Sequence, residues 1–199
     1  ATDNGSAVAP GDFVANSGQL TFTGNDGESH PITVAIVDDN IIEATENFLV
    51  DLSNLSTNLI SINTPQANGN IVDNDGGAGT GISFDNTNVT VNEDAGTATF
   101  NVVLSGNVAG GFTLDYATDN GSAIAPGDFV ANSGQLSFTG NDGESHPITV
   151  VINDDNIIEA TENFLVDLSN LSTTLISINT PQANGNIVDN DGGAGTGIS

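Results

Sequence analysis

The chain repeats itself with an offset of 116 residues, because the segment that starts at Ala1 returns at Ala117 (117 − 1 = 116). A near-identical repeat of this length indicates an array of separately folded modules, since solenoids are built from much shorter units of about 20–45 residues. Residues 1–83 and 117–199 differ at five positions, namely Val8/Ile124, Thr21/Ser137, Ala35/Val151, Val37/Asn153 and Asn58/Thr174.

Within one repeat, apolar and polar residues alternate over short segments that are bounded by Gly, Asn, Asp and Pro. Phe100, Val102 and Leu104 are an example of this alternation. The pattern is typical of half-buried β-strands, and about seven such strands predict an all-β fold of tandem immunoglobulin-like antiparallel β-sandwiches. The expected strands of the complete repeat are residues 82–92, 96–105, 110–118, 134–139, 146–153, 162–169 and 183–188.

The same pattern divides the chain into one incomplete and one complete module. Residues 1–75 have no counterpart of residues 82–116, so we expect an incomplete repeat that lacks its first strands. A Gly-rich linker is expected at 76–81, a complete repeat at 82–191, and a linker with the start of a further repeat at 192–199. The missing strands would come from preceding residues of a longer protein or from another copy of the chain.

The charge balance excludes several classes of function. The chain has 26 Asp and Glu residues and no Lys or Arg, for a net charge of −26. Binding to nucleic acid or to anionic lipid needs cationic side chains, so we expect neither partner. No apolar run approaches the roughly 20 residues of a membrane-spanning helix, so we expect no membrane insertion. Two histidines without a recognisable partner do not predict an enzyme.

Acidic residues concentrate where the ends of alternate strands should meet at one pole of the sandwich. Carboxylates about 6 Å apart repel by roughly 1.4 kcal/mol at an effective dielectric constant near 40, so clustered acids require wide spacing or bound cations. The opposite pole has only Asp142 and Glu144. The acids of the first pole are Glu93, Asp94, Asp119, Asp128, Asp154, Asp155, Glu159, Glu162, Asp189 and Asp191.

Calcium is the cation that such a pole would suit. Ca²⁺ takes six to eight oxygen ligands and tolerates irregular loops, whereas Mg²⁺ demands stricter geometry and Zn²⁺ prefers His or Cys. The alternative is a solvated acidic cap that binds no metal.

Four motifs of the complete repeat recur together in one known family: Gly127-Asp128-Phe129, Gly134-Gln135-Leu136-Ser137-Phe138, Ile152-Asn153-Asp154-Asp155 and Glu159-Ala160-Thr161-Glu162-Asn163-Phe164. With these motifs the chain resembles the Calx-beta domain, a family named for the regulatory calcium-binding domains of sodium–calcium exchangers that recurs in bacterial surface proteins and adhesins. The resemblance implies Ca²⁺ ligands at Glu93, Asp128, Asp154, Asp155, Glu159, Glu162, Asp189 and Asp191, and in the earlier repeat at Asp12, Asp38, Asp39, Glu43, Glu46, Asp73 and Asp75.

We therefore predict an extracellular or cell-surface structural repeat, the stalk or fibre module of an adhesin, in which Ca²⁺ at one pole stiffens the joint between repeats. Its partners would be neighbouring repeats and other copies in a fibre. The alternatives are a calcium-sensing regulatory module and an acidic spacer without metal.

Overall fold

The computed structural model describes residues 1–192, so the expected linker and start of a further repeat at 192–199 lies outside the described residues except for Gly192. The chain forms two compact units, Ala1–Asp75 and Gly76–Ser199. Among the described residues, no helix has the length and apolar character needed to cross a membrane.

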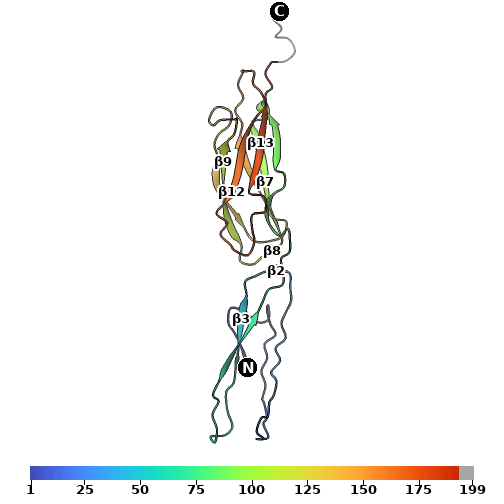
Figure 1. Cartoon of the computed structure of the whole chain (residues 1–199), viewed down its shortest axis with the longest axis vertical. Coiled ribbons are helices and arrows are strands. Elements are labelled where there is room, and N and C mark those ends of the chain that lie inside the picture. The colour runs from blue at the N-terminus through green and yellow to red at the C-terminus, as the bar shows by residue number, and fades with distance from the viewer. Residues whose placement is uncertain (193–199) are drawn as a thin grey trace, which may run out of the picture. The chain divides into compact units, whose positions relative to one another are not determined.

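The second unit is a β-sandwich of two sheets, whose strands β12 and β13 lie side by side in Figure 1. A 3₁₀ turn η1 (Glu93–Ala95) follows β6, and the short strand β8 (Asn107–Val108) follows β7. The larger sheet has the order β10 (Ser133–Phe138), β9 (Phe112–Asn120), β12 (Glu162–Ser169), β13 (Gln182–Val188) and β6 (Asn88–Asn92). The smaller sheet has the order β11 (Ser145–Val151), β7 (Thr97–Ser105) and β5 (Gly81–Phe84).

The core of the second unit lies between these sheets and is built from the apolar phase of each strand. Phe100 from the smaller sheet packs against Phe164 from the larger one, with ring centroids 5.9 Å apart. Phe129 stacks on Phe164 at 4.7 Å, and all three rings are fully buried. The structure therefore confirms the all-β sandwich that the alternation of apolar and polar residues predicts.

The prediction of one continuous strand at 82–92 is wrong, because these residues form two strands, β5 and β6, in different sheets. The chain leaves the smaller sheet at Asp85, and the backbone N–H of Asn88 donates to Asn86 Oδ1 at 3.0 Å, a local turn that interrupts the ladder. The crossing also makes β6 parallel to β13, although every other named strand pair in this unit is antiparallel.

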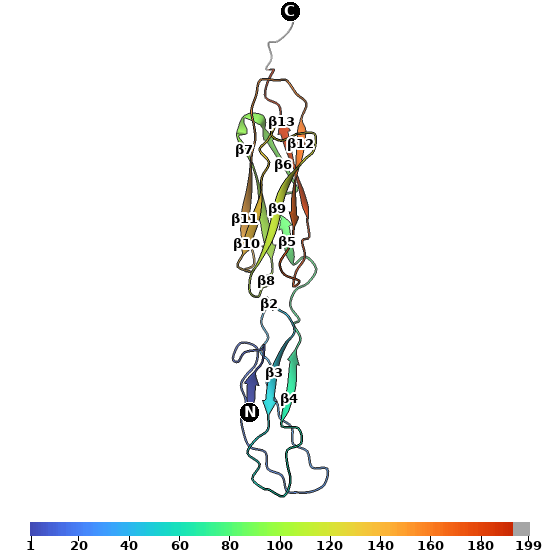
Figure 2. The ribbon, with the colours of Figure 1, turned by 90° about the vertical axis from the view of Figure 1, so that its left-hand side faces the viewer.

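The first unit contains a single three-stranded sheet, in which β1 (Thr2–Asn4), β3 (Glu46–Asp51) and β4 (Gln66–Ile71) lie side by side (Figure 2). A short strand β2 (Ile41–Ile42) precedes β3. Its core is small: Phe13 stacks on Phe48 with ring centroids 4.9 Å apart, and Ala7 is buried beside them.

Segments 17–22 and 29–35 form no strand in the first unit, although their counterparts form β10 and β11. In the second unit β10 pairs with β9, and β11 pairs with β7. The first unit has no counterpart of β7 or of the first residues of β9, so these two segments have no neighbouring strand to complete their hydrogen bonds.

Candidate metal centre

The strand register of the second unit brings the acid-bearing ends of five strands to one pole. The turn η1 follows β6 at this pole, and the chain leaves β13 there through Asp189. At this pole the last paired residues of neighbouring strands are Val151 with Thr97, Glu162 with Ile187, Phe164 with Asn120, and Val188 with Asn92.

One group of carboxylates at this pole consists of Asp128, Glu159 and Glu162, with one oxygen of each within 4.8 Å of the others. Asp128 is held by its own loop, because its Oδ2 accepts the backbone N–H of Ile124 at 2.6 Å. Burial raises the pKa of Glu162, and the charge of Asp128 and a hydrogen bond with it raise that pKa further. Burial and the charge of Asp128 also raise the pKa of Glu159.

A second group consists of Glu93, Asp189 and Asp191, again with one oxygen of each within 4.8 Å of the others. Glu93 is only 5% exposed, and its Oε1 accepts the backbone N–H of Asp155 at 3.3 Å. Within the described residues, the buried atoms Glu93 Oε2 and Asp191 Oδ2 have no hydrogen-bond partner. Buried carboxylate oxygens without a donor are costly, so a cation between them would remove a penalty that the fold otherwise carries.

Asp155 lies within electrostatic reach of both groups, and Asp154 lies within reach of the second. Burial raises the pKa of Glu93, and the charges of Asp155 and Asp154 raise it further. The charge of Asp155 also contributes to the raised pKa of Glu159. The structure thus gathers the eight acids of this repeat that the resemblance implies as ligands into one cluster, the second cluster: Glu93, Asp128, Asp154, Asp155, Glu159, Glu162, Asp189 and Asp191.

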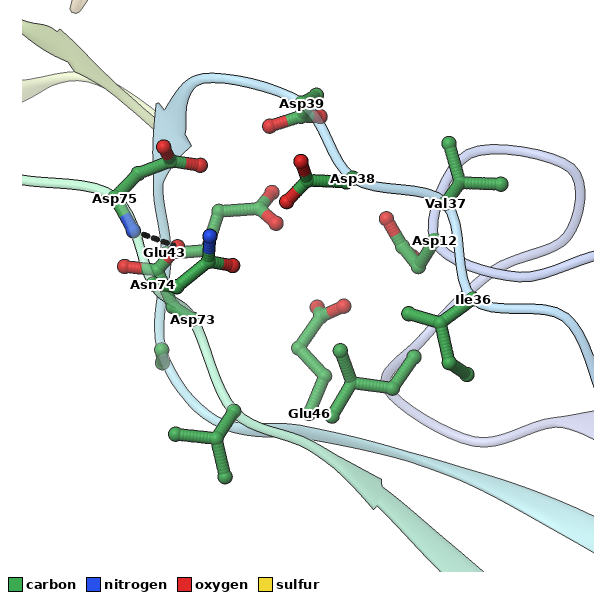
Figure 3. Close-up of a pocket in the computed structure, with 13 residues that line it drawn as sticks. Asp12, Ile36, Val37, Asp38, Asp39, Glu43, Glu46, Asp73, Asn74 and Asp75 are labelled. Atoms are coloured by element: carbon green, nitrogen blue, oxygen red, sulfur yellow. Dashed lines mark hydrogen bonds between the residues drawn. The ribbon is translucent and has the colours of Figure 1, made fainter.

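The first unit gathers the corresponding acids around a pocket, the first cluster (Figure 3). One oxygen each of Asp12, Glu43 and Glu46 lies within 4.8 Å of the others, and Asp12 Oδ2 accepts the backbone N–H of Val8 at 2.6 Å. Burial raises the pKa of Glu43, and the charge of Asp12 raises it further. The acids that line the pocket are Asp12, Asp38, Asp39, Glu43, Glu46, Asp73 and Asp75.

The two clusters differ in two respects. The first has no counterpart of Glu93, since the chain has no residues that correspond to the η1 turn in that unit. It also has Val37 where the second unit has Asn153. The Asn153 Nδ2 donates to the carbonyls of Pro126 at 2.7 Å and Gly127 at 3.0 Å and so fixes the loop that holds Asp128.

Sequence reasoning missed two kinds of residue at the clusters. Asn153 supports the site through backbone carbonyls, and its only signal was that it immediately precedes Asp154 and Asp155. Asn74, between Asp73 and Asp75, lines the first pocket. In the second unit the side-chain Oδ1 of Asn190 accepts the backbone N–H of Asp94 at 3.2 Å.

Two acids that were expected at the pole stay outside the carboxylate groups. Asp94 and Asp119 are exposed, and neither belongs to a group of converging oxygens. Asp94 lies in η1 beside Glu93 but points its backbone N–H at Asn190, whereas Asp119 lies within β9.

The ligand chemistry of both clusters fits a hard cation. The side chains that converge are carboxylates, which supply only oxygen, and most of them come from loops that can adjust to an irregular shell of six to eight ligands. Neither cluster contains His or Cys among its described residues, the ligands that Zn²⁺ prefers.

Comparisons with known proteins match the same regions. The model of the Calx-beta domain matches residues 1–75 and again residues 77–191. Sodium/calcium exchanger 2 of Homo sapiens is 31% identical over 183 residues, covering 84% of this chain and 19% of the exchanger. Sodium/calcium exchanger 1 of Rattus norvegicus is 29% identical over 184 residues, with the same shares. The chain thus spans about a fifth of the length of these relatives.

Solved structures give the same result for the fold. The Calx CBD1 domain in its apo form superimposes with a TM-score of 0.52 and 30% identity, covering 55% of this chain and 96% of that domain. The calcium binding domain CBD12 of CALX1.1 superimposes with a TM-score of 0.52 and 29% identity, covering 55% of this chain and 44% of that structure. The family match over both units shows that the chain belongs to the Calx-beta domain family.

Proposed function

We propose that this chain is a non-enzymatic, calcium-sensing module in which each acidic cluster takes up Ca²⁺. The observation that carries the proposal is the second cluster, where carboxylates from separate segments of the chain converge. Two of their oxygens, Glu93 Oε2 and Asp191 Oδ2, are buried and accept no hydrogen bond. Ca²⁺ would supply the positive charge that the chain itself lacks, because the sequence has no Lys or Arg.

The proposed ligands follow the two carboxylate groups of the second unit. Asp128, Glu159 and Glu162 would hold one ion, and Glu93, Asp189 and Asp191 another, with Asp154 and Asp155 close to the second group. In the first unit, Asp12, Glu43 and Glu46 form the corresponding group, with Asp38, Asp39, Asp73 and Asp75 around the same pocket.

A sensing role has the support of the relatives. They are sodium/calcium exchangers and domains described as calcium binding. The loop between Asp154 and Glu162 forms no strand and carries Glu159, a member of one carboxylate group. Asp154 and Asp155 at its start act through their charges on Glu93 of the other group. Filling the sites would order this loop, and the change would be transmitted through β12, which begins at Glu162.

A second candidate is the structural repeat of an extracellular stalk or fibre, with neighbouring repeats as partners. The near-identity of the two repeats favours it, because spacers need only length and rigidity, whereas sensors tend to diverge in affinity. In that role, ions held by Asp73 and Asp75 would restrain the Gly-rich segment that follows at 76–81.

Calorimetric titration of the calcium-depleted full chain with Ca²⁺ tests the proposal. We expect saturable binding, which the double variant Asp154→Ala/Asp155→Ala in the second unit reduces and the control Asp142→Ala at the opposite pole leaves unchanged. Dissociation constants of about 10⁻⁷–10⁻⁵ M support the sensor, and values of about 10⁻⁴–10⁻³ M support the extracellular spacer. A chain that releases no heat and shows no melting shift with Ca²⁺ contradicts both.

A further inference from the structure

A chain of hydrogen bonds between polar side chains crosses the larger sheet of the second unit beside the acidic pole. Asn163 Nδ2 donates to Asn184 Oδ1 at 2.9 Å, and Asn184 Nδ2 donates to Asn186 Oδ1 at 2.7 Å. Asn186 Nδ2 donates in turn to Thr90 Oγ1 at 3.3 Å. At the other end, Ser122 Oγ donates to Asn163 Oδ1 at 3.2 Å and accepts the backbone N–H of Asn163 at 2.9 Å. We call Ser122, Asn163, Asn184, Asn186 and Thr90 the asparagine ladder.

The ladder lies next to the pole because of the register of its strands. Asn163 pairs with Asn186, and Asn186 pairs with Thr90, so these three residues form one row across β12, β13 and β6. The neighbouring row toward the pole pairs Glu162 with Ile187. The row of the ladder is therefore one residue away from a carboxylate of the second cluster.

Each end of the ladder holds a segment that carries a different carboxylate group. Ser122 belongs to the loop 121–128, which ends at Asp128, and the backbone N–H of Ala123 in this loop donates to the carbonyl of Asn163 at 2.9 Å. Thr90 belongs to β6, which leads directly into η1 and Glu93. The ladder thus ties the loop of one group, Asp128, Glu159 and Glu162, to the strand that precedes the other group, Glu93, Asp189 and Asp191.

The residue types of the ladder are not those that best stabilise a sheet. Asparagine is depleted in β-strands, yet three asparagines of β12 and β13 belong to the ladder. Leu165 and Val188 have the same phase as these asparagines in their strands, so apolar residues fit on this face. The first unit has the corresponding bonds from Asn47 to Asn68 at 2.9 Å and from Asn68 to Asn70 at 2.8 Å. The recurrence indicates a role that depends on the hydrogen bonds.

We propose that the asparagine ladder couples the two carboxylate groups of the second unit, with Asn163 and Asn184 as positioning residues, so that a cation in one group raises the affinity of the other. This coupling rests on the proposed function, because it needs a cation in each group. A cation bound by Asp128 orders the loop 121–128, and the ladder transmits this order through β13 to β6. The second cation then finds Glu93 already placed and has less disorder to remove.

Amide hydrogen exchange of the calcium-depleted full chain, titrated with Ca²⁺, tests the coupling because it follows each segment separately. Fragments of 121–128 differ in mass from those of 5–12, since Ile124 stands where the first unit has Val8. In the parent chain, protection of residues 121–128 and 92–95 should rise over the same range of Ca²⁺ concentration. In Asn184→Leu the midpoints of the two segments should separate by at least about threefold.

The matched control is Gln182→Leu. Gln182 lies in β13, two residues before Asn184 and therefore in the same phase, and its Nε2 donates to Asp167 Oδ1 in β12 at 2.7 Å. The control also removes a side-chain hydrogen bond between β12 and β13, so it should lower the melting temperature in a similar way. It should nevertheless leave the two midpoints together, because its bond lies outside the ladder.

A second pair of variants acts at the other end of the ladder. Ser122 is exposed, so Ser122→Ala should keep the fold while it removes the side-chain contact with Asn163. It should separate the midpoints as Asn184→Leu does. Ser122→Thr retains the hydroxyl and should keep them together. If Asn184→Leu fails to fold, Ser122→Ala decides by the same criterion.

The outcomes distinguish the coupling from calcium binding itself. Midpoints that separate in the ladder variants but not in Gln182→Leu or Ser122→Thr support the coupling. Midpoints that already differ in the parent chain, that stay together in the ladder variants, or that separate equally in Gln182→Leu overturn it, while calcium-dependent protection of the parent chain still supports the proposed function. A parent chain that gains no protection at any Ca²⁺ concentration refutes the proposed function, and the coupling falls with it.

Discussion

The substitution Asp128→Asn separates two roles of a carboxylate in the second cluster, the hydrogen bond that anchors its loop and the negative charge that it brings to the cluster. Asparagine keeps an oxygen that can accept the backbone N–H of Ile124, now 2.6 Å from Asp128 Oδ2, so the loop should keep its anchor. The change removes one negative charge from a group whose oxygens lie within 4.8 Å of one another. It should therefore have opposite effects on stability without and with calcium.

The size of the first effect follows from the pair formed by Asp128 and Glu162. At 4.8 Å two unit charges repel by about 1 kcal/mol at the dielectric constant of water and by about 3.5 kcal/mol at an effective value near 20. A relief of roughly 2 kcal/mol should raise the melting temperature of the second unit by about 5–10 °C in calcium-depleted buffer. With excess Ca²⁺ the variant should melt at a lower temperature than the parent chain, because it has lost one charged ligand.

Differential scanning calorimetry of the full chain in both buffers measures these shifts, with Asp119→Asn as the matched control. Asp119 is an exposed acid of β9 outside both carboxylate groups, so its substitution should alter the two melting temperatures by the same small amount. If Asp128→Asn melts at a lower temperature than the parent chain in both buffers, charge repulsion is not what limits the calcium-free fold, and the reasoning fails.

Three further predictions concern other parts of the chain. Burial raises the pKa of Glu144, but hydrogen bonds from His146, Thr139 and Gly140 outweigh it and lower the pKa from 4.5 to about 2. The stabilisation should be complete above pH 4.5 and lost as the pH falls toward 2, by at most about 3 kcal/mol, and Glu144→Gln should remove this loss in acid-unfolding curves. For Glu93 the effect of pH on stability is the opposite, because its pKa is raised and protonation therefore favours the folded state. Calcium-depleted protein should thus melt at a higher temperature as the pH falls from 7 toward 5, whereas calcium-loaded protein should melt at a lower temperature. Finally, Asn153→Val should weaken calcium binding by the second unit about fivefold in calorimetric titration, because two hydrogen bonds to the loop of Asp128 disappear, and an unchanged affinity would show that this loop needs no such support.

Much of the second unit was predictable because its strands follow local patterns. The alternation of Phe100, Val102 and Leu104 places all three in the core, as expected. The break after Phe84 was missed, although Asp85, Asn86 and Asn88 are residue types that favour turns, because apolar residues continue on both sides of it. Which sheet a strand joins is decided by packing at a distance, which periodicity does not record.

The candidate site shows the same division. Convergence of the acids followed from strand order, because ends of alternate strands meet at one pole whatever the details of each loop. The burial of Glu93 did not follow, since it depends on the position of η1, where Glu93 Oε1 accepts the backbone N–H of Asp155. The loss of strands at 17–22 and 29–35 depends on partners elsewhere in the fold. The local sequence could not reveal it, because it differs from that of β10 and β11 only at Thr21/Ser137 and Ala35/Val151.

The parallel pairing of β6 with β13 has a mechanical consequence. The strand β6 lies near the start of the second unit and β13 near its end, and both run in the same direction. Tension applied to the two ends would therefore slide one strand along the other and load their shared hydrogen bonds together rather than one after another. Such a shear arrangement resists stretching far better than a hairpin that can be unzipped from one end.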